Sequence, residues 1–243
     1  MPITRKHPSR SAADGAAVTS ATTPVARVRR NNPEDHDRMR KSCLAAAEAL
    51  FASGGVEAVT MRAVAAEVGV SPMSPYRYFY DKAELLSGLW ESVIRKLCDE
   101  MRTAIEKQRG GRKRQRASID AFLGYWERSP DHYRLVYMTE QTTRPAAMTT
   151  PQSGASVYAE ILEVVRGVTQ DLADEIGASM KHAKVAGDIR FAMMLGYLQG
   201  TLINKRYPWT ARRTLREAFI EQVIATVERC LLHGPLGRGP PAP

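Results

Sequence analysis

Apolar residues recur at intervals of three and four through most of residues 33–233, which is the period of an α-helix. One such stripe consists of Met39, Cys43, Ala47 and Leu50. It ends before Gly54-Gly55, a pair that favours the end of a helix. No segment shows a convincing two-residue alternation that would indicate a strand. The pattern predicts an all-α fold.

Two short helices joined by a tight turn are predicted next. Thr60 suits the N-cap of the first, and Gly69 suits the left-handed position at its C-terminal end. The second begins at one of two Ser-Pro steps, Ser71-Pro72 or Ser74-Pro75, because proline is compatible only with the first turn of a helix. The sequence leaves both starts open. Two helices in this arrangement are typical of a helix-turn-helix that places one helix in the major groove of DNA.

A long helix is expected over residues 82–107, where Asp81 and Glu84 form a capping-box sequence. Its length of about 39 Å exceeds what a small recognition domain needs internally, so we expect it to link two domains. Glycines and basic residues at 110–116 predict a solvated loop after it.

The remaining chain predicts further helices. We expect them at 119–128, through Tyr133 and Val136, and at Ala155–Ile176, Met180–Asn204 and Ala211–Leu232, with a loop at 139–153. Low complexity predicts disordered tails at 1–33 and 234–243.

The segment ALFASGGVEAVTMRAVAAEVGVSPMSPYRYFYDKAELL, residues 49–86, resembles the N-terminal domain of the tetracycline-repressor-like (TetR) family of bacterial regulators. The likeness extends in order over residues 38–93. It implies a helix-turn-helix DNA-binding domain at 34–93 and a C-terminal effector-binding and dimerisation domain at 94–233. Beyond about residue 95 only the number and order of helices match, so the second domain is inferred from the family alone.

The resemblance implies DNA contacts on and around the second short helix. The candidates are Thr60, Arg62, Ser71, Met73, Ser74, Tyr76, Arg77, Tyr78 and Lys82. Hydroxyl and basic groups at helix starts suit phosphates, and a guanidinium such as that of Arg77 can bind guanine through two hydrogen bonds. Structural roles compete with these: Thr60 can be only a cap, and Tyr76 can be packing.

The C-terminal domain offers aromatic and Met side chains that would line an effector pocket. They are Trp90, Met101, Phe122, Trp126, Tyr133, Tyr137, Met138, Met193, Met194 and Tyr197. Most of them are expected to be ordinary core, since such a stripe at helical spacing usually is. Because few charged residues fall among them, the sequence favours a small apolar or aromatic effector. Small residues at Gly187, Ala192, Gly196 and Gly200 favour close packing of this helix against a second copy.

Taken with these features, the resemblance implies a homodimeric repressor that binds a palindromic operator in double-stranded DNA and is released by its effector. The two recognition helices must stand about 34 Å apart to enter successive major grooves. The alternative is an effector-independent DNA-binding or architectural protein whose C-terminal domain only dimerises.

Charge and composition limit the other classes of protein. The net charge is +9, but residues 1–33 carry six basic groups against Asp14 alone, while residues 34–91 hold six basic and nine acidic groups. The tail therefore carries a net charge of +5, and its Arg27, Arg29 and Arg30 are predicted to follow the DNA backbone or to enter a minor groove. An organelle transit peptide is the less favoured reading of the tail.

Catalysis has little support in the sequence. Three cysteines and five scattered histidines form no metal-ligand or catalytic spacing, and no phosphate-binding glycine loop is present. The sequence therefore predicts no enzyme, no cofactor and no metal site. No apolar run is long enough to cross a bilayer, so a cytoplasmic protein without membrane contact is expected.

Overall fold

The structure, a computed structural model, describes residues 33–138 and 154–235, and within these ranges it holds helices and turns but no strand. The predicted all-α class is confirmed. The helices are α1 (Pro33–Ala58), α2 (Met61–Val68), α3 (Lys82–Glu106), α4 (Gly111–Arg128), α5 (Pro130–Tyr137), α6 (Gly154–Ile176), α7 (Ala183–Leu198) and α8 (Arg212–His233). The loop predicted at 139–153, and the tails apart from residues 33, 234 and 235, lie outside the described residues.

Local signals set the N-terminal helices. α1 breaks where the sequence predicts, because Gly55 takes a left-handed φ of 67°, and one more turn continues to Ala58. The Thr60 hydroxyl accepts a hydrogen bond from the Ala63 N–H at 3.1 Å and so caps α2. Gly69, with a φ of 76°, ends α2 in the left-handed conformation. The sequence determines α2 at both ends.

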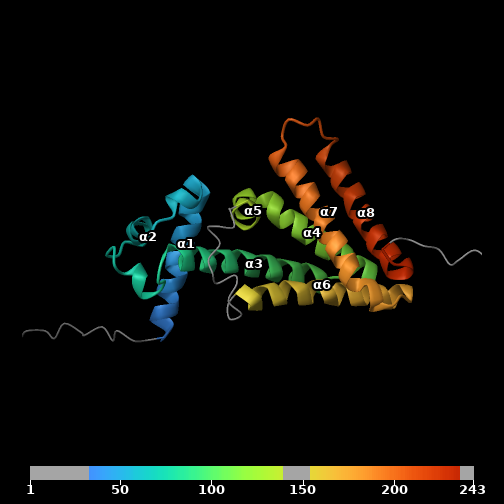
Figure 1. Ribbon diagram of the computed structural model, residues 1–243, viewed down its shortest axis with the longest axis horizontal. Coiled ribbons are helices and arrows are strands. Elements are labelled where there is room, and N and C mark those ends of the chain that lie inside the picture. The colour runs from blue at the N-terminus through green and yellow to red at the C-terminus, as the bar shows by residue number, and fades with distance from the viewer. Residues whose placement is uncertain (1–32, 139–153, 236–243) are drawn as a thin grey trace, which may run out of the picture.

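α3 is the long helix that connects the N-terminal helices to the C-terminal ones (Figure 1). The Asp81 carboxylate accepts from the Glu84 N–H at 2.8 Å, and the Glu84 carboxylate accepts from the Tyr80 N–H at 2.6 Å. The predicted cap is thus present, with its return bond one residue earlier than in a standard capping box. α3 runs from α1 and α2 at one end into the middle of the C-terminal helices (Figure 1).

The basic segment at 110–116 is not a loop, and that prediction is wrong. α4 begins at Gly111, which lies so close to α6 that a Cβ there would stand 2.1 Å from the Asp171 carbonyl oxygen. Arg112 pairs with Glu221 of α8 at 2.7 Å, and Arg114 pairs with Asp171 at 2.6 Å. Because these carboxylates come from distant parts of the chain, the local charge pattern alone did not reveal them.

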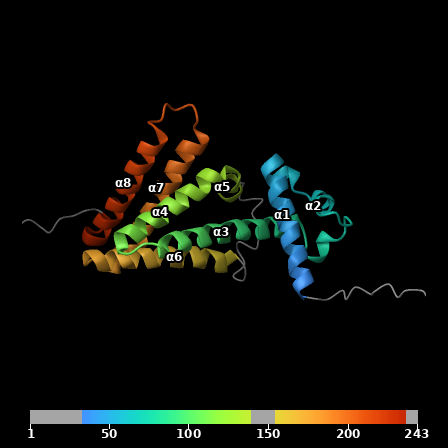
Figure 2. The ribbon, with the colours of Figure 1, turned by 180° about the vertical axis from the view of Figure 1, so that it is seen from behind.

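The C-terminal helices surround α3 and then extend away from the N-terminal domain. α4 and α6 pack on α3, while α7 and α8 lie side by side at the end remote from α2 (Figures 1 and 2). The single helix predicted at Met180–Asn204 is divided into a 3₁₀ turn (Met180–His182), α7 and a π turn (Gln199–Ile203). One hydrophobic core continues from Cys43 in α1 to Ile224 in α8. No helix in the described ranges combines the length and apolar character needed to span a bilayer.

Candidate nucleic-acid interface

The segment that was expected to form a recognition helix is a turn followed by a 3₁₀ helix over Pro75–Arg77. The second Ser-Pro step is therefore the start, and Ser74 occupies the N-cap position. Pro75 lacks an N–H, and in a longer helix its ring would clash with the carbonyl of Ser71. The Ser71 and Ser74 hydroxyls instead lie 2.9 Å apart and hold the turn together.

Most of the predicted DNA-contact residues lie on the exposed surface of this end of the molecule. Exposed side chains are those of Thr60, Arg62, Ser71, Met73, Tyr76 and Arg77, and Ser74 is half-buried. Met73 is 69% exposed, which is unusual for a large apolar side chain in a folded domain. Phe79 is buried beneath them, with the Arg40 guanidinium 4.6 Å from its ring centroid. Phe79 therefore anchors the turn in the core, while most side chains of the turn are exposed to solvent.

Two predicted residues are held by the protein itself. The Lys82 ammonium donates to the Val56 carbonyl at 2.7 Å and so ties the start of α3 to the turn after Gly55. Tyr78 is half-buried, and its ring centroid lies 4.8 Å from that of His36 in α1. Any contact that these two side chains make with DNA would use only their remaining exposed atoms.

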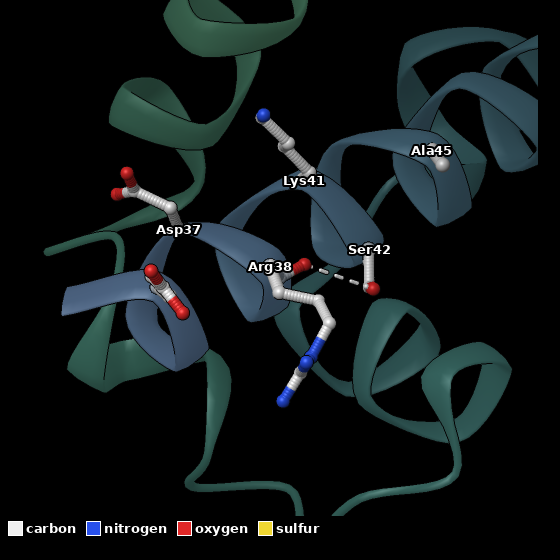
Figure 3. A pocket seen from close by; sticks show the side chains of 6 residues that line it. Asp37, Arg38, Lys41, Ser42 and Ala45 are labelled. Atoms are coloured by element: carbon white, nitrogen blue, oxygen red, sulfur yellow. Dashed lines mark hydrogen bonds between the residues drawn. The ribbon is translucent and has the colours of Figure 1, made fainter. Parts of the chain in front are cut away.

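An open hollow lies along the first turns of α1 (Figure 3). It is lined by Glu34, Asp37, Arg38, Lys41, Ser42 and Ala45. All six belong to one helix, and the Ser42 hydroxyl donates to the Arg38 carbonyl at 3.0 Å. Two acidic and two basic side chains line it, so the hollow does not present the uniform positive charge that suits phosphate.

A hydrogen-bonded network joins α1 to α3, α4 and α5. His132 of α5 lies between Glu48 of α1, at 2.9 Å, and the Tyr125 hydroxyl of α4, at 3.0 Å. Lys96 of α3 also donates to Glu48, at 2.7 Å. Hydrogen bonds from His132 and Lys96 lower the pKa of Glu48 to about 2 against the cost of its burial. The carboxylate is therefore firmly ionised where α5 meets α1.

The sequence did not identify this network. Asp131-His132 is an adjacent acid and imidazole in the first turn of α5, where an Asp is ordinarily explained by the helix start alone. Its partner Glu48 lies 84 residues earlier, on the polar side of an otherwise ordinary helix. The one local signal was a histidine at a helix N-terminus, where a positive charge is not favoured by the helix dipole.

Four of the predicted effector residues, Phe122, Trp126, Tyr133 and Tyr137, form an aromatic cluster. Trp126 has ring neighbours at Phe122, 6.0 Å away, Tyr133, 6.0 Å away, and Tyr137, 5.3 Å away. Trp90, Met101, Met194 and Tyr197 are also buried, Tyr137 and Met193 are half-buried, and Met138 is 46% exposed. None of the ten lines the hollow on α1, that between α3 and α4, or that between α3, α4 and α6.

One buried polar residue of this region was missed. Arg190 of α7 is 1% exposed and lies within the C-terminal helices. It falls in a helical stripe with Ala186, Met194 and Tyr197, all of them buried. A charged residue at an apolar position of a stripe was the sequence signal that could have identified it.

In the ranges that the structure describes, no three His, Cys, Asp or Glu side chains are placed to hold a metal ion. Cys43, Cys98 and Cys230 are free and buried. Burial raises the pKa of each thiol, to about 11 for Cys98, so none of them has the character of a reactive thiolate.

Comparison with known proteins supports a regulatory domain at this end of the chain. Residues 44–89 match the model for bacterial regulatory proteins of the tetR family. The HTH-type transcriptional activator FasR of Mycolicibacterium smegmatis is 31% identical over 117 residues, which cover 48% of this chain and 53% of FasR. This chain thus spans about half the length of the curated relatives it matches.

Solved structures share the fold over most of the chain. A TetR family transcription regulator from Marinobacter aquaeolei VT8 matches with a TM-score of 0.59 at 20% identity, covering 79% of this chain and 96% of that one. FadR from Bacillus subtilis, solved in complex with stearoyl-CoA, matches with a TM-score of 0.60 at 14% identity, covering 77% and 98%. At these identities the likeness shows the fold alone. Residues 44–89 thus match a domain of the tetR family of bacterial regulatory proteins, and the all-helical fold of the described residues agrees with that of solved tetR family regulators.

Proposed function

We propose that this protein is a ligand-responsive repressor that binds a palindromic operator as a homodimer. The observation that carries the proposal is the exposed turn over residues 71–78, presented on a domain whose core continues into α3. Side chains that can reach base edges and phosphates surround this turn, among them Arg62, Tyr76 and Arg77. A short turn of this kind can enter the major groove provided that its flanks are anchored, as Phe79 anchors this one.

The dimer interface is assigned to α7 and α8. A Cβ at Gly187 or Gly196 would meet nothing within 4 Å, so these positions leave room for a neighbouring backbone. Gly200 is different, because a Cβ there would lie 3.0 Å from the Trp209 ring of the same chain. Ala192 and Phe191 are exposed on α7, and Leu232 is exposed on α8. This surface suits an isologous contact between two copies.

The network around His132 supplies a route by which an effector acts on DNA binding. α5 carries Tyr133 and Tyr137 of the aromatic cluster on the same short helix as His132, which bonds to α1. A ligand that moves α5 would therefore shift α1 and the turn beside it. Such a ligand binds the shifted arrangement more tightly than the DNA-binding arrangement. Operator affinity then falls by the difference between these two binding free energies. The buried aromatic side chains of this cluster favour a ligand with an apolar body.

The proposal is tested by footprinting the full chain on the DNA upstream of its own gene. The expected result is one protected palindrome, with half-sites about one helical turn apart and affinity that falls steeply with salt. A reporter gene carrying this palindrome in its promoter should be repressed by the protein. Cell extracts should contain a compound that relieves this repression. Binding to all duplexes alike would contradict the proposal. Specific binding that no compound relieves would favour the effector-independent alternative.

A further inference from the structure

The Arg190 guanidinium is buried among the C-terminal helices. Its Nη2 donates to the Ser118 hydroxyl of α4 at 2.8 Å, and its Nε has no hydrogen-bond partner. Among the residues that the structure describes, no carboxylate pairs with it. Burial lowers the pKa of Arg190 to about 10, which still leaves the group charged at neutral pH. A buried charge is costly unless a partner of opposite sign meets it.

A second polar side chain lies on the same face of α4. Gln115, one helical turn before Ser118, is fully buried, and neither atom of its side-chain amide has a partner within the described ranges. Gln115 and Arg190 come from different helices, and Arg190 bonds to Ser118, one helical turn after Gln115. Buried polar atoms without a partner thus occur at Gln115 and at the arginine that bonds to the next turn of α4. Native interiors seldom leave such groups unsatisfied without a functional reason.

The same face of α4 becomes apolar and aromatic further along. Phe122 and Trp126 follow Ser118 at intervals of four residues, so the face extends about 12 Å from the hydroxyl to the indole. Phe191, next to Arg190, has its ring centroid 6.4 Å from that of Phe122. A molecule seated here would meet hydrogen-bond donors at one end and rings along its length.

We propose that Arg190, Gln115 and Ser118 bind the carboxylate of an organic acid whose apolar body lies along Phe122 and Trp126. This inference rests on the proposed ligand response, and it adds an acid group to the apolar or aromatic effector expected from the sequence. A carboxylate supplies the missing negative charge and accepts two parallel hydrogen bonds from a guanidinium. The Gln115 amide and Ser118 hydroxyl can donate to its remaining lone pairs.

The test is titration calorimetry of the full chain without DNA. Decanoate and 3-phenylpropanoate are each compared with the alcohol of the same carbon skeleton. We expect at least one acid to bind at least tenfold more tightly than its alcohol. Arg190→Met should reduce that ratio to about one, and Arg190→Lys should keep part of it because the charge remains without the planar fork. The proposal is overturned if neither acid binds, if acid and alcohol bind alike, or if the preference survives in Arg190→Met.

Thermal unfolding of the ligand-free proteins separates ligand binding from a structural role of Arg190. If the charge serves a ligand, Arg190→Met should unfold at the same temperature as the wild type or higher, since an isosteric apolar residue removes an unpaired charge. A large fall in the unfolding temperature would show that Arg190 supports the fold and would contradict the proposal. Operator binding is measured separately, so a protein that binds decanoate but no operator refutes only the proposed function.

Discussion

The His132 imidazole Nε2 lies 2.9 Å from the Glu48 carboxylate Oε1, and this contact fastens α5 of the C-terminal domain to α1 of the N-terminal domain. Both side chains are largely shielded from solvent, at 16% and 29% exposure. An ion pair or hydrogen bond shielded in this way is stronger than one on an open surface. The stability of the junction should therefore depend on pH through Glu48.

Glu48→Gln should lower the free energy of unfolding by about 1–2 kcal/mol at pH 7. The pKa of Glu48 is depressed to about 2 in the folded chain, so its contribution is complete above the unfolded pKa of about 4.3 and is lost as the pH falls toward 2. Urea unfolding at pH 7, 4 and 2.5 should show the difference from wild type shrinking at the acid end. Glu57→Gln, an exposed change in the same helix, is the control; a pH-independent deficit in Glu48→Gln would contradict this assignment.

Arg77→Ala should weaken operator binding by about 10- to 100-fold, the range expected for loss of one two-bonded base contact. The side chain is exposed on the 3₁₀ turn, so its removal leaves the fold intact. Fluorescence anisotropy with operator and scrambled duplexes measures the change. Arg109→Ala, an exposed arginine between α3 and α4, should leave affinity unchanged. Equal weakening on both duplexes would make Arg77 a phosphate contact.

The two roles of Thr60 can be separated by substitution. Thr60→Ala removes the cap on the Ala63 N–H and should cost about 1 kcal/mol of stability as well as DNA affinity. Thr60→Asp keeps a capping oxygen but places a negative charge beside the phosphates, so it should fold normally and bind DNA poorly. Thermal unfolding and anisotropy are compared for the two variants. Normal operator binding by Thr60→Asp would show that Thr60 caps α2 and makes no contact with DNA.

Gly111→Ala should destabilise the protein by about 3 kcal/mol or more, because a Cβ there would stand 2.1 Å from the Asp171 carbonyl oxygen and force α4 away from α6. Gly167→Ala is the matched control in α6, where a Cβ meets nothing within 4 Å. That change should stabilise by up to about 1 kcal/mol through helix propensity. Chemical denaturation measures the free energy of unfolding of both variants. An unchanged free energy in Gly111→Ala would mean that α4 does not approach α6 so closely.

Charges on the exposed face of α7 should disrupt the dimer. Ala192→Glu and Gly196→Glu lie one turn apart, and a two-fold interface would bring each charge near its own copy. Sedimentation should show monomers for the double variant and dimers for wild type, with operator affinity lost in parallel. Ala52→Glu, exposed on α1, should remain dimeric. A dimeric double variant would exclude this face from the interface.

The sequence by itself determined the elements whose causes are local. The capping oxygens of Thr60 and Asp81, the left-handed glycines 55 and 69, and the helical period from residue 82 act within a few residues, and each appears where it was expected. The two Ser-Pro steps limited the recognition turn to two possible starts, but only the folded chain selected the second. Local propensities cannot rank two starts that are equally compatible with proline.

Tertiary structure alone decided the contacts between segments distant in the chain. Arg112, Arg114 and Arg116 of α4 pair with carboxylates 57 to 116 residues away, and the Lys82 ammonium donates to a carbonyl 26 residues earlier. The contact of His132 with Glu48 and the isolation of Arg190 arise in the same way. Each depends on how helices pack, and packing places side chains together according to the whole core rather than to their neighbours in sequence.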